Sequence, residues 1–97
     1  MSAPSAPITA MLIWNGIKIM VTHTPNRFGV VDHIELHSED HQRLPVTETG
    51  YRSHWVYEDQ IEPYGSALAF VQAWLDTEAR SPAWRAYVEA SRQLDLF

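Results

Sequence analysis

The sequence predicts an α+β fold, in which an antiparallel β-meander of about four strands is followed by a C-terminal αα-hairpin. Two observations predict it. In the first half of the chain, apolar and polar residues alternate with the period of two that strands with one buried face show. From Ile61 onward the period lengthens to 3.6, which is typical of amphipathic helices. Because the strands come before the helices, we expect the helices to cover one sheet face.

The first expected element is a β-hairpin. Residues 8–14 and 17–24 are apolar, β-prone runs, and Asn15-Gly16 lies between them. Asn-Gly is the strongest short-range signal for a two-residue turn, since both residues tolerate the positive φ angles of a type I′ turn. Residues 24–29 follow as an expected loop, with Pro25 and Gly29 as its breakers.

A third strand is expected over residues 30–38 and a fourth over residues 44–47, where Pro45 favours an edge position. Residues 51–57 fit either a fifth short strand or an extended segment that crosses the sheet, and the pattern leaves both open. In the third strand, His33, Glu35 and His37 alternate with apolar residues and therefore share the polar face.

Two helices complete the fold. The first is expected to begin near Ile61, with Pro63 in its first turn, and to end near residues 79–80. Ser81-Pro82 then predicts a new helix, because serine is a good N-cap and proline fits the first helical position. The short connection between the two helices predicts the αα-hairpin.

Length and composition indicate one domain over residues 8–92. Residues 1–7 form a Pro-rich leader that is expected to be flexible, and residues 93–97 form a separate tail. The net charge of −5 argues against direct binding to duplex DNA, which normally needs a basic face. The chain has no cysteine, so disulfides and thiolate zinc sites are excluded. Without an apolar run long enough to span a membrane, or a secretion signal, a cytoplasmic protein is expected.

The densest polar and aromatic cluster lies between residues 47 and 55 and offers one candidate site: Glu48, Tyr51, Arg52, His54 and Trp55. In a site on a loop, Arg52 would hold a phosphate or carboxylate, His54 would move a proton, and Glu48 would orient either. The aromatic rings would stack on a base or line a pocket. The alternative is a capped turn whose aromatic side chains pack into the domain while Arg52 pairs with Glu48.

Three histidines at a spacing of four raise the question of a metal site: His33, His37 and His41. In a strand, only His33, Glu35 and His37 share a face, at about 6.5–7 Å between successive positions. That spacing permits a surface contact but gives no closed site. We therefore expect solvated side chains there, and neither a metal nor another cofactor.

The last five residues carry the most specific pattern: Gln93-Leu94-Asp95-Leu96-Phe97. This string resembles, at every position, the pentapeptide with which bacterial replication and repair proteins bind the DNA polymerase sliding clamp. The resemblance implies that Gln93 occupies a polar subsite and that Leu94, Leu96 and Phe97 fill an apolar groove, with Asp95 solvated. Each buried anchor contributes about 1.5–3 kcal/mol, which supports micromolar affinity after ordering costs.

The expected function is therefore non-enzymatic: docking on the bacterial sliding clamp through residues 93–97, to recruit a partner or to compete with polymerases. Such a protein would suit a plasmid, phage or other mobile element. One alternative is a binding or regulatory module that acts through residues 48–55, with a tail whose apolar side chains complete the core. An enzyme that uses His54 and Glu48 would need a pocket that joins the two groups.

Overall fold

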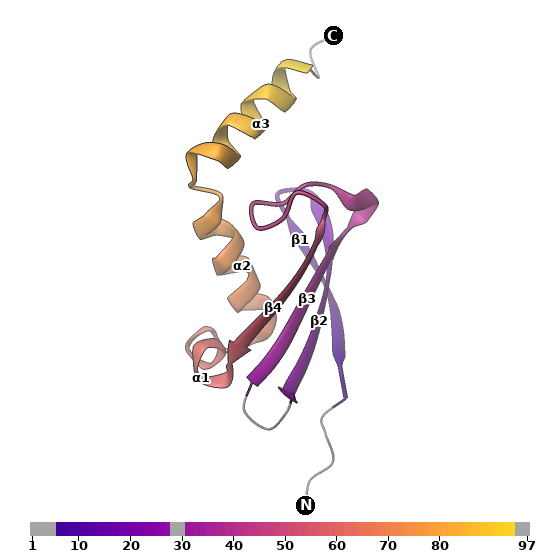
Figure 1. Cartoon of the computed structure of the whole chain (residues 1–97), viewed down its shortest axis with the longest axis vertical. Helices are drawn as coiled ribbons and strands as arrows, with labels where there is room; N and C mark the ends of the chain where they lie inside the picture. The colour runs from indigo at the N-terminus through magenta and orange to yellow at the C-terminus, as the bar shows by residue number, and fades with distance from the viewer. Residues whose placement is uncertain (1–5, 28–30, 95–97) are drawn as a thin grey trace, which may run out of the picture.

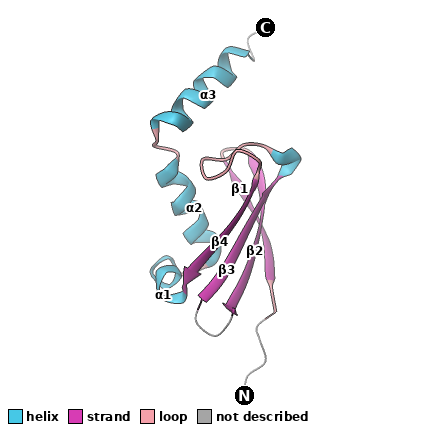
Figure 2. Cartoon of the chain, in the orientation of Figure 1, coloured by secondary structure: helices cyan, strands magenta, loops and turns pink. Residues whose placement is uncertain are grey.

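The computed structural model of the protein describes residues 6–27 and 31–94. One antiparallel sheet is followed by helices, which confirms the predicted α+β class (Figure 2). In chain order the elements are β1 (Ile8–Trp14), β2 (Ile17–Arg27), β3 (Val31–Ser38), η1 (Glu39–His41), β4 (Tyr51–Tyr57), α1 (Glu58–Ile61), η2 (Glu62–Tyr64), α2 (Ala67–Glu78) and α3 (Pro82–Leu94). The strands lie in the sheet in the order β1-β2-β3-β4, as in a meander.

The predicted hairpin is present, and it is longer than the sequence indicates. Asn15 and Gly16 have φ angles of 47° and 80°, the positive values that a type I′ turn requires. The expected loop after residue 24 is wrong in part, since β2 continues to Arg27. The pairing with β3 shifts register between Thr24 and Arg27. Pro25 is tolerated at this irregularity because it need not donate to the ladder.

The fourth strand lies at a different place from the one predicted. Residues 44–47 form a tight turn, in which the Leu44 N–H donates to the Thr47 carbonyl (2.9 Å) and the Thr47 N–H to the Leu44 carbonyl (3.1 Å). Because Leu44 and Thr47 pair with each other, this segment does not form a strand beside β3. Instead β4 pairs with β3, and the open question about residues 51–57 is settled in favour of a strand.

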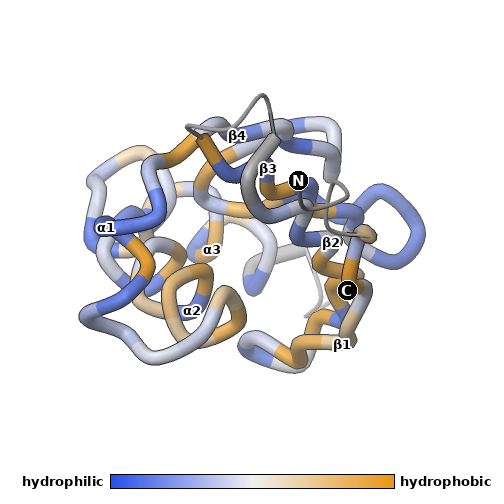
Figure 3. Tube along the Cα trace, turned by 90° about the horizontal axis from the view of Figure 1, so that it is seen from below, coloured by the Kyte–Doolittle hydropathy of each residue, from blue (hydrophilic) through white to orange (hydrophobic). Residues whose placement is uncertain are grey.

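The core lies between one face of the sheet and α2. Ile19, Ile34 and Leu36 of the sheet are fully buried, as are Val71 and Leu75 of α2. Viewed from below, the helices lie on one side of the strands and leave the other side uncovered (Figure 3). We call the two sides the inner face and the outer face. The prediction that helices cover one face is thus confirmed.

The first long helix begins later than predicted. Gly65, with φ of 86°, separates the short α1 and η2 from α2. The Ser66 side chain then caps α2 by accepting a hydrogen bond from the Ala69 N–H (3.1 Å). Pro63 lies in η2 rather than in the first turn of α2. The predicted end is confirmed, since α2 stops at Glu78.

The second helix begins at Ser81-Pro82 as predicted, with the Trp84 N–H donating to the Ser81 hydroxyl (3.2 Å). The two helices are not arranged as a closed hairpin. From the end of α2, α3 continues away from the sheet instead of returning beside α2 (Figure 1). The first turn of α3 is held to the sheet, since Trp84 packs on Trp14 with ring centroids 5.8 Å apart. Within residues 6–27 and 31–94, no helix is long and apolar enough to cross a membrane.

Candidate interaction surfaces

The beginning of α3 is the part of this helix that is held most tightly to the body. Trp84 is 8% exposed, and the Trp14 ring beneath it is oriented by a hydrogen bond from its Nε1 to Asp76 Oδ1 (2.8 Å). Further along α3, Tyr87 is half-buried and Arg92 is exposed. In Figure 1 the end of α3 lies far from the sheet. Val88 and Arg92 nevertheless still line a hollow of about 500 Å³ with Trp14 at the end of the β1–β2 hairpin.

One further contact holds α3 to the loop before β4. The Arg43 guanidinium lies 4.7 Å from the centre of the Tyr87 ring, a cation–π distance. Arg43 Nη2 also lies 3.7 Å from Glu48 Oε1. The Glu48 side chain is 82% exposed, so this ion pair is weak. Glu48 thus pairs with Arg43, and the predicted pairing with Arg52 is wrong.

The predicted clamp-binding residues fall mostly outside the described part of the chain. Backbone atoms of Gln93 and Leu94 belong to α3. Their side chains, and all of Asp95, Leu96 and Phe97, lie outside the described residues.

The other predicted site is divided between the two faces of the sheet. Because residues 51–57 form a strand rather than a loop, successive side chains point to opposite faces. Tyr51 and Trp55 lie on the outer face. Arg52 and His54 lie on the inner face, since they pair with the buried Leu36 and Ile34. The structure does not bring Glu48 and His54 together in a pocket, as an enzymatic site would need.

On the inner face, His54 belongs to an aromatic cluster with α2. Its ring stacks on Trp74 (centroids 4.5 Å apart) and lies 6.4 Å from Phe70. The Arg52 guanidinium lies 5.8 Å from the centre of the Trp74 ring. Burial disfavours the imidazolium and Arg52 repels it, so the pKa of His54 is lowered from its ordinary value of 6.5. The fold therefore favours the neutral form of His54.

This arrangement predicts how stability changes with pH. The pKa of His54 is lower in the folded state, so the unfolded state takes up a proton first as the pH falls through 6.5. Wild type should then lose stability between pH 7 and pH 5 relative to His54→Phe, which keeps an aromatic ring but has no titrating group. Urea unfolding of both proteins at the two pH values measures the change. A constant difference between them would contradict the prediction.

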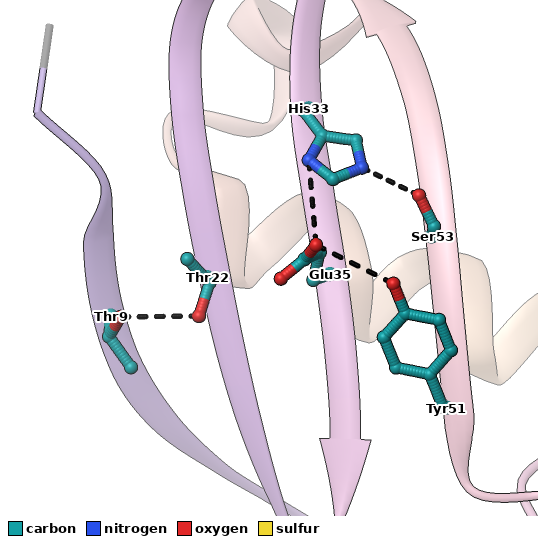
Figure 4. Close-up of polar contacts among 6 residues, drawn as sticks. All are labelled: Thr9, Thr22, His33, Glu35, Tyr51 and Ser53. Carbon is teal, nitrogen blue, oxygen red and sulfur yellow. Dashed lines mark hydrogen bonds and ion pairs between the residues drawn. The ribbon is translucent and has the colours of Figure 1, made fainter.

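On the outer face, His33 is the centre of a polar network (Figure 4). Its Nε2 lies 2.6 Å from the Ser53 hydroxyl, and its Nδ1 lies 3.9 Å from Glu35 Oε1. The Tyr51 hydroxyl donates to the same Glu35 oxygen (3.5 Å). Trp55 covers the imidazole, with ring centroids 4.3 Å apart. His33 is consequently only 6% exposed, so the expectation that it is solvated is wrong.

The predicted grouping of His33, Glu35 and His37 on one face is confirmed. In residues 6–27 and 31–94, no three His, Cys, Asp or Glu side chains are arranged to hold a metal ion. His41 lies apart from the others, in η1 at the end of β3.

The outer face also exposes large apolar side chains that the sequence reasoning did not single out. Met11 is 49% exposed and Met20 is 38% exposed, and Ile13 lies beside them. Such a face is unusual, since an uncovered sheet face is normally polar. The sequence does indicate these exposed side chains in β1. Residues 10–14 are apolar at every position, so apolar side chains lie on both faces of this strand.

Comparison with known proteins gives a family match. Residues 7–84 match the family model described as the KlcB third domain. The matched range contains the whole sheet, α2 and the first residues of α3, and it ends before the pentapeptide. No curated protein and no solved structure matches the chain.

Proposed function

The chain belongs to the KlcB third-domain family. We propose that it is a small, non-enzymatic interaction module that docks on the bacterial sliding clamp. The docking segment is residues 93–97. The observation that carries the proposal is the pentapeptide itself, which fits the clamp-binding pattern at each position.

The position of the pentapeptide supports this function. Its first two residues end α3, a helix in which Trp84 is buried and Arg92 is exposed. The helical backbone of Gln93 is no obstacle, because terminal helical turns open at a small free-energy cost. Ordering the segment costs about 2–5 kcal/mol, which three apolar anchors at about 1.5–3 kcal/mol each offset.

The charge of the chain fits the same function. A net charge of −5 is unfavourable for contact with the DNA phosphates. A protein that reaches the replication machinery by binding the clamp needs no basic face. The body then recruits a second partner to the clamp, or the tail excludes polymerases from the groove.

The test is a titration of purified bacterial sliding clamp with the whole protein and two variants. Wild type should bind with micromolar affinity, whereas the double variant Leu96→Ala/Phe97→Ala should bind at least about 30-fold more weakly, because two anchors are lost. Asp95→Ala is the matched control and should stay within about 3-fold of wild type, since this position is expected to be solvated. Absence of wild-type binding, or equal binding by the double variant, would overturn the proposal.

The alternative is a binding module that acts through residues 48–55 and has a purely structural tail. The exposure of Tyr51 and Trp55 on the outer face favours it. A structural tail predicts that deletion of residues 93–97 lowers thermal stability. The clamp proposal predicts that the same deletion leaves thermal stability unchanged and abolishes clamp binding, so calorimetry and titration of one truncated protein separate the two.

A further inference from the structure

A row of soft donor atoms crosses the uncovered outer face of the sheet. In the strand register, Met11 of β1 is opposite Met20 of β2, and Met20 is opposite His37 of β3. His37 is in turn opposite Tyr51 of β4. Directly opposite side chains have Cβ atoms about 4.5–5.5 Å apart. Two thioethers and one imidazole are therefore immediate neighbours, with Met20 in the middle.

These three side chains also converge on one feature of the surface. Together with Lys18, Ser38 and Glu39, they line a shallow hollow of about 340 Å³. Both methionines and His37 are exposed, so an ion from solvent reaches them directly. The unbranched methionine side chain has three rotatable bonds and adapts its sulfur position. Both sulfur atoms are thus able to turn toward a single point above Met20.

The donor set selects the class of metal. Thioether sulfur is a soft, neutral ligand that favours Cu(I), whereas Mg²⁺ and Ca²⁺ require oxygen ligands. Zn²⁺ sites in proteins are built from thiolate, imidazole and carboxylate groups. A set of two thioethers and one imidazole is therefore expected to bind hard cations weakly and soft monovalent cations tightly.

The surroundings of the row affect the strength of such a site. The Tyr51 ring lies 4.7 Å from the His37 ring and limits its rotation, which reduces the entropy that binding costs. Lys18 lines the same hollow and opposes a cation, and Glu39 on the same rim offsets that charge.

We propose that Met11, Met20 and His37 bind one soft monovalent metal ion, Cu(I) or its redox-inert analogue Ag(I). The site uses none of the clamp-binding residues, so it stands independently of the function proposed above. It also differs from the His33, His37 and His41 set considered from the sequence, because it takes two of its three ligands from the β1–β2 hairpin.

The experiment is a titration of the whole protein with Ag(I) in chloride-free buffer, followed by NMR of the ¹³C-labelled methionine methyl groups. The chain has three methionines, and Met1 is not part of the row. The Met11 and Met20 methyl signals should shift and saturate at one Ag(I) per chain, with Met1 unchanged. Equal shifts at all three methionines would overturn the proposal, because they would show non-specific binding to thioethers.

Variants test the ligand set. Met20→Leu keeps the volume and apolar character of an exposed side chain, and it should weaken Ag(I) binding at least about 10-fold, as should His37→Gln. His41→Gln is the matched control, since it removes an exposed histidine outside the row and should leave the affinity unchanged. Unaltered affinity in Met20→Leu, or displacement of Ag(I) by a moderate excess of Zn²⁺, would overturn the assignment. The amide NMR spectrum of each variant establishes that it is folded.

Discussion

Replacement of Gly50 by alanine is expected to lower the free energy of unfolding by about 2–5 kcal/mol, the sum of a backbone and a steric cost. Gly50 has φ of 82°, a left-handed conformation that residues with a Cβ rarely adopt. An added Cβ would collide with the Ser38 hydroxyl and would lie 2.7 Å from the carbonyl carbon of His41. The His41 atom belongs to the backbone, so the clash is not relieved by a change of rotamer.

The local hydrogen bonds make this position rigid. The Ser38 N–H donates to the Gly50 carbonyl (2.8 Å), and the Ser38 hydroxyl donates to the Gln42 carbonyl (2.6 Å). The end of β3 and the start of β4 are held together here, so relaxation at Gly50 would break the entry into β4.

Gly65→Ala is the matched control for Gly50→Ala. Gly65 has φ of 86°, and an added Cβ would meet no atom within 4 Å. It should therefore cost only the left-handed backbone penalty, about 1–2 kcal/mol. Urea unfolding of both variants measures the two losses. Equal losses would show that the close approach at Gly50 contributes nothing.

Local signals account for the part of the fold that the sequence predicts well. The hairpin turn depends on the φ angles that Asn15 and Gly16 themselves adopt. The start of α3 depends on the Ser81 side chain, which caps the helix, and on the Pro82 ring, which fits the first helical position. Both act within a few residues, so their effect is visible in the sequence. The class of the fold follows from the change of hydrophobic period, which is also a local property.

The fourth strand depends on contacts that the sequence does not display. β4 places Arg52 and His54 on the inner face, where a simple pattern requires apolar residues. Trp74 of α2 stacks on the imidazole and lies under the guanidinium, so polar side chains are accommodated there. The apolar segment at residues 44–47 is the better strand by pattern, but it closes a turn instead.

The candidate sites also differ in whether the sequence alone indicates them. The proposed clamp-binding pentapeptide is a linear pattern, so Leu96 and Phe97 are proposed as anchors from the sequence alone. The burial of His33 under Trp55 and the alignment of Met20 with His37 depend on strand register. Register joins residues that are far apart in the chain, and one residue of slip would send each side chain to the opposite face. Neither arrangement is therefore predictable from a single sequence.

Replacement of Trp84 by alanine should separate the role of the helix from that of the tail. Trp84 is the buried side chain through which α3 packs on Trp14, and its ring also lies 5.2 Å from that of Tyr87. Loss of a buried tryptophan costs about 3–5 kcal/mol. Urea unfolding should show this loss, whereas Tyr57→Ala, at an aromatic residue that is 60% exposed, should change stability by no more than about 0.5 kcal/mol.

The same variant should leave clamp binding almost intact under conditions where it is folded. If residues 93–97 act as a separate ligand, their affinity depends on their own anchors and not on how α3 packs. Clamp affinity of Trp84→Ala should then stay within about 3-fold of wild type, a difference of less than about 1 kcal/mol. If the tail instead belongs to the core, loss of Trp84 releases it and clamp affinity rises with the loss of stability. A rise of tenfold or more would therefore show that the body competes with the clamp for the tail.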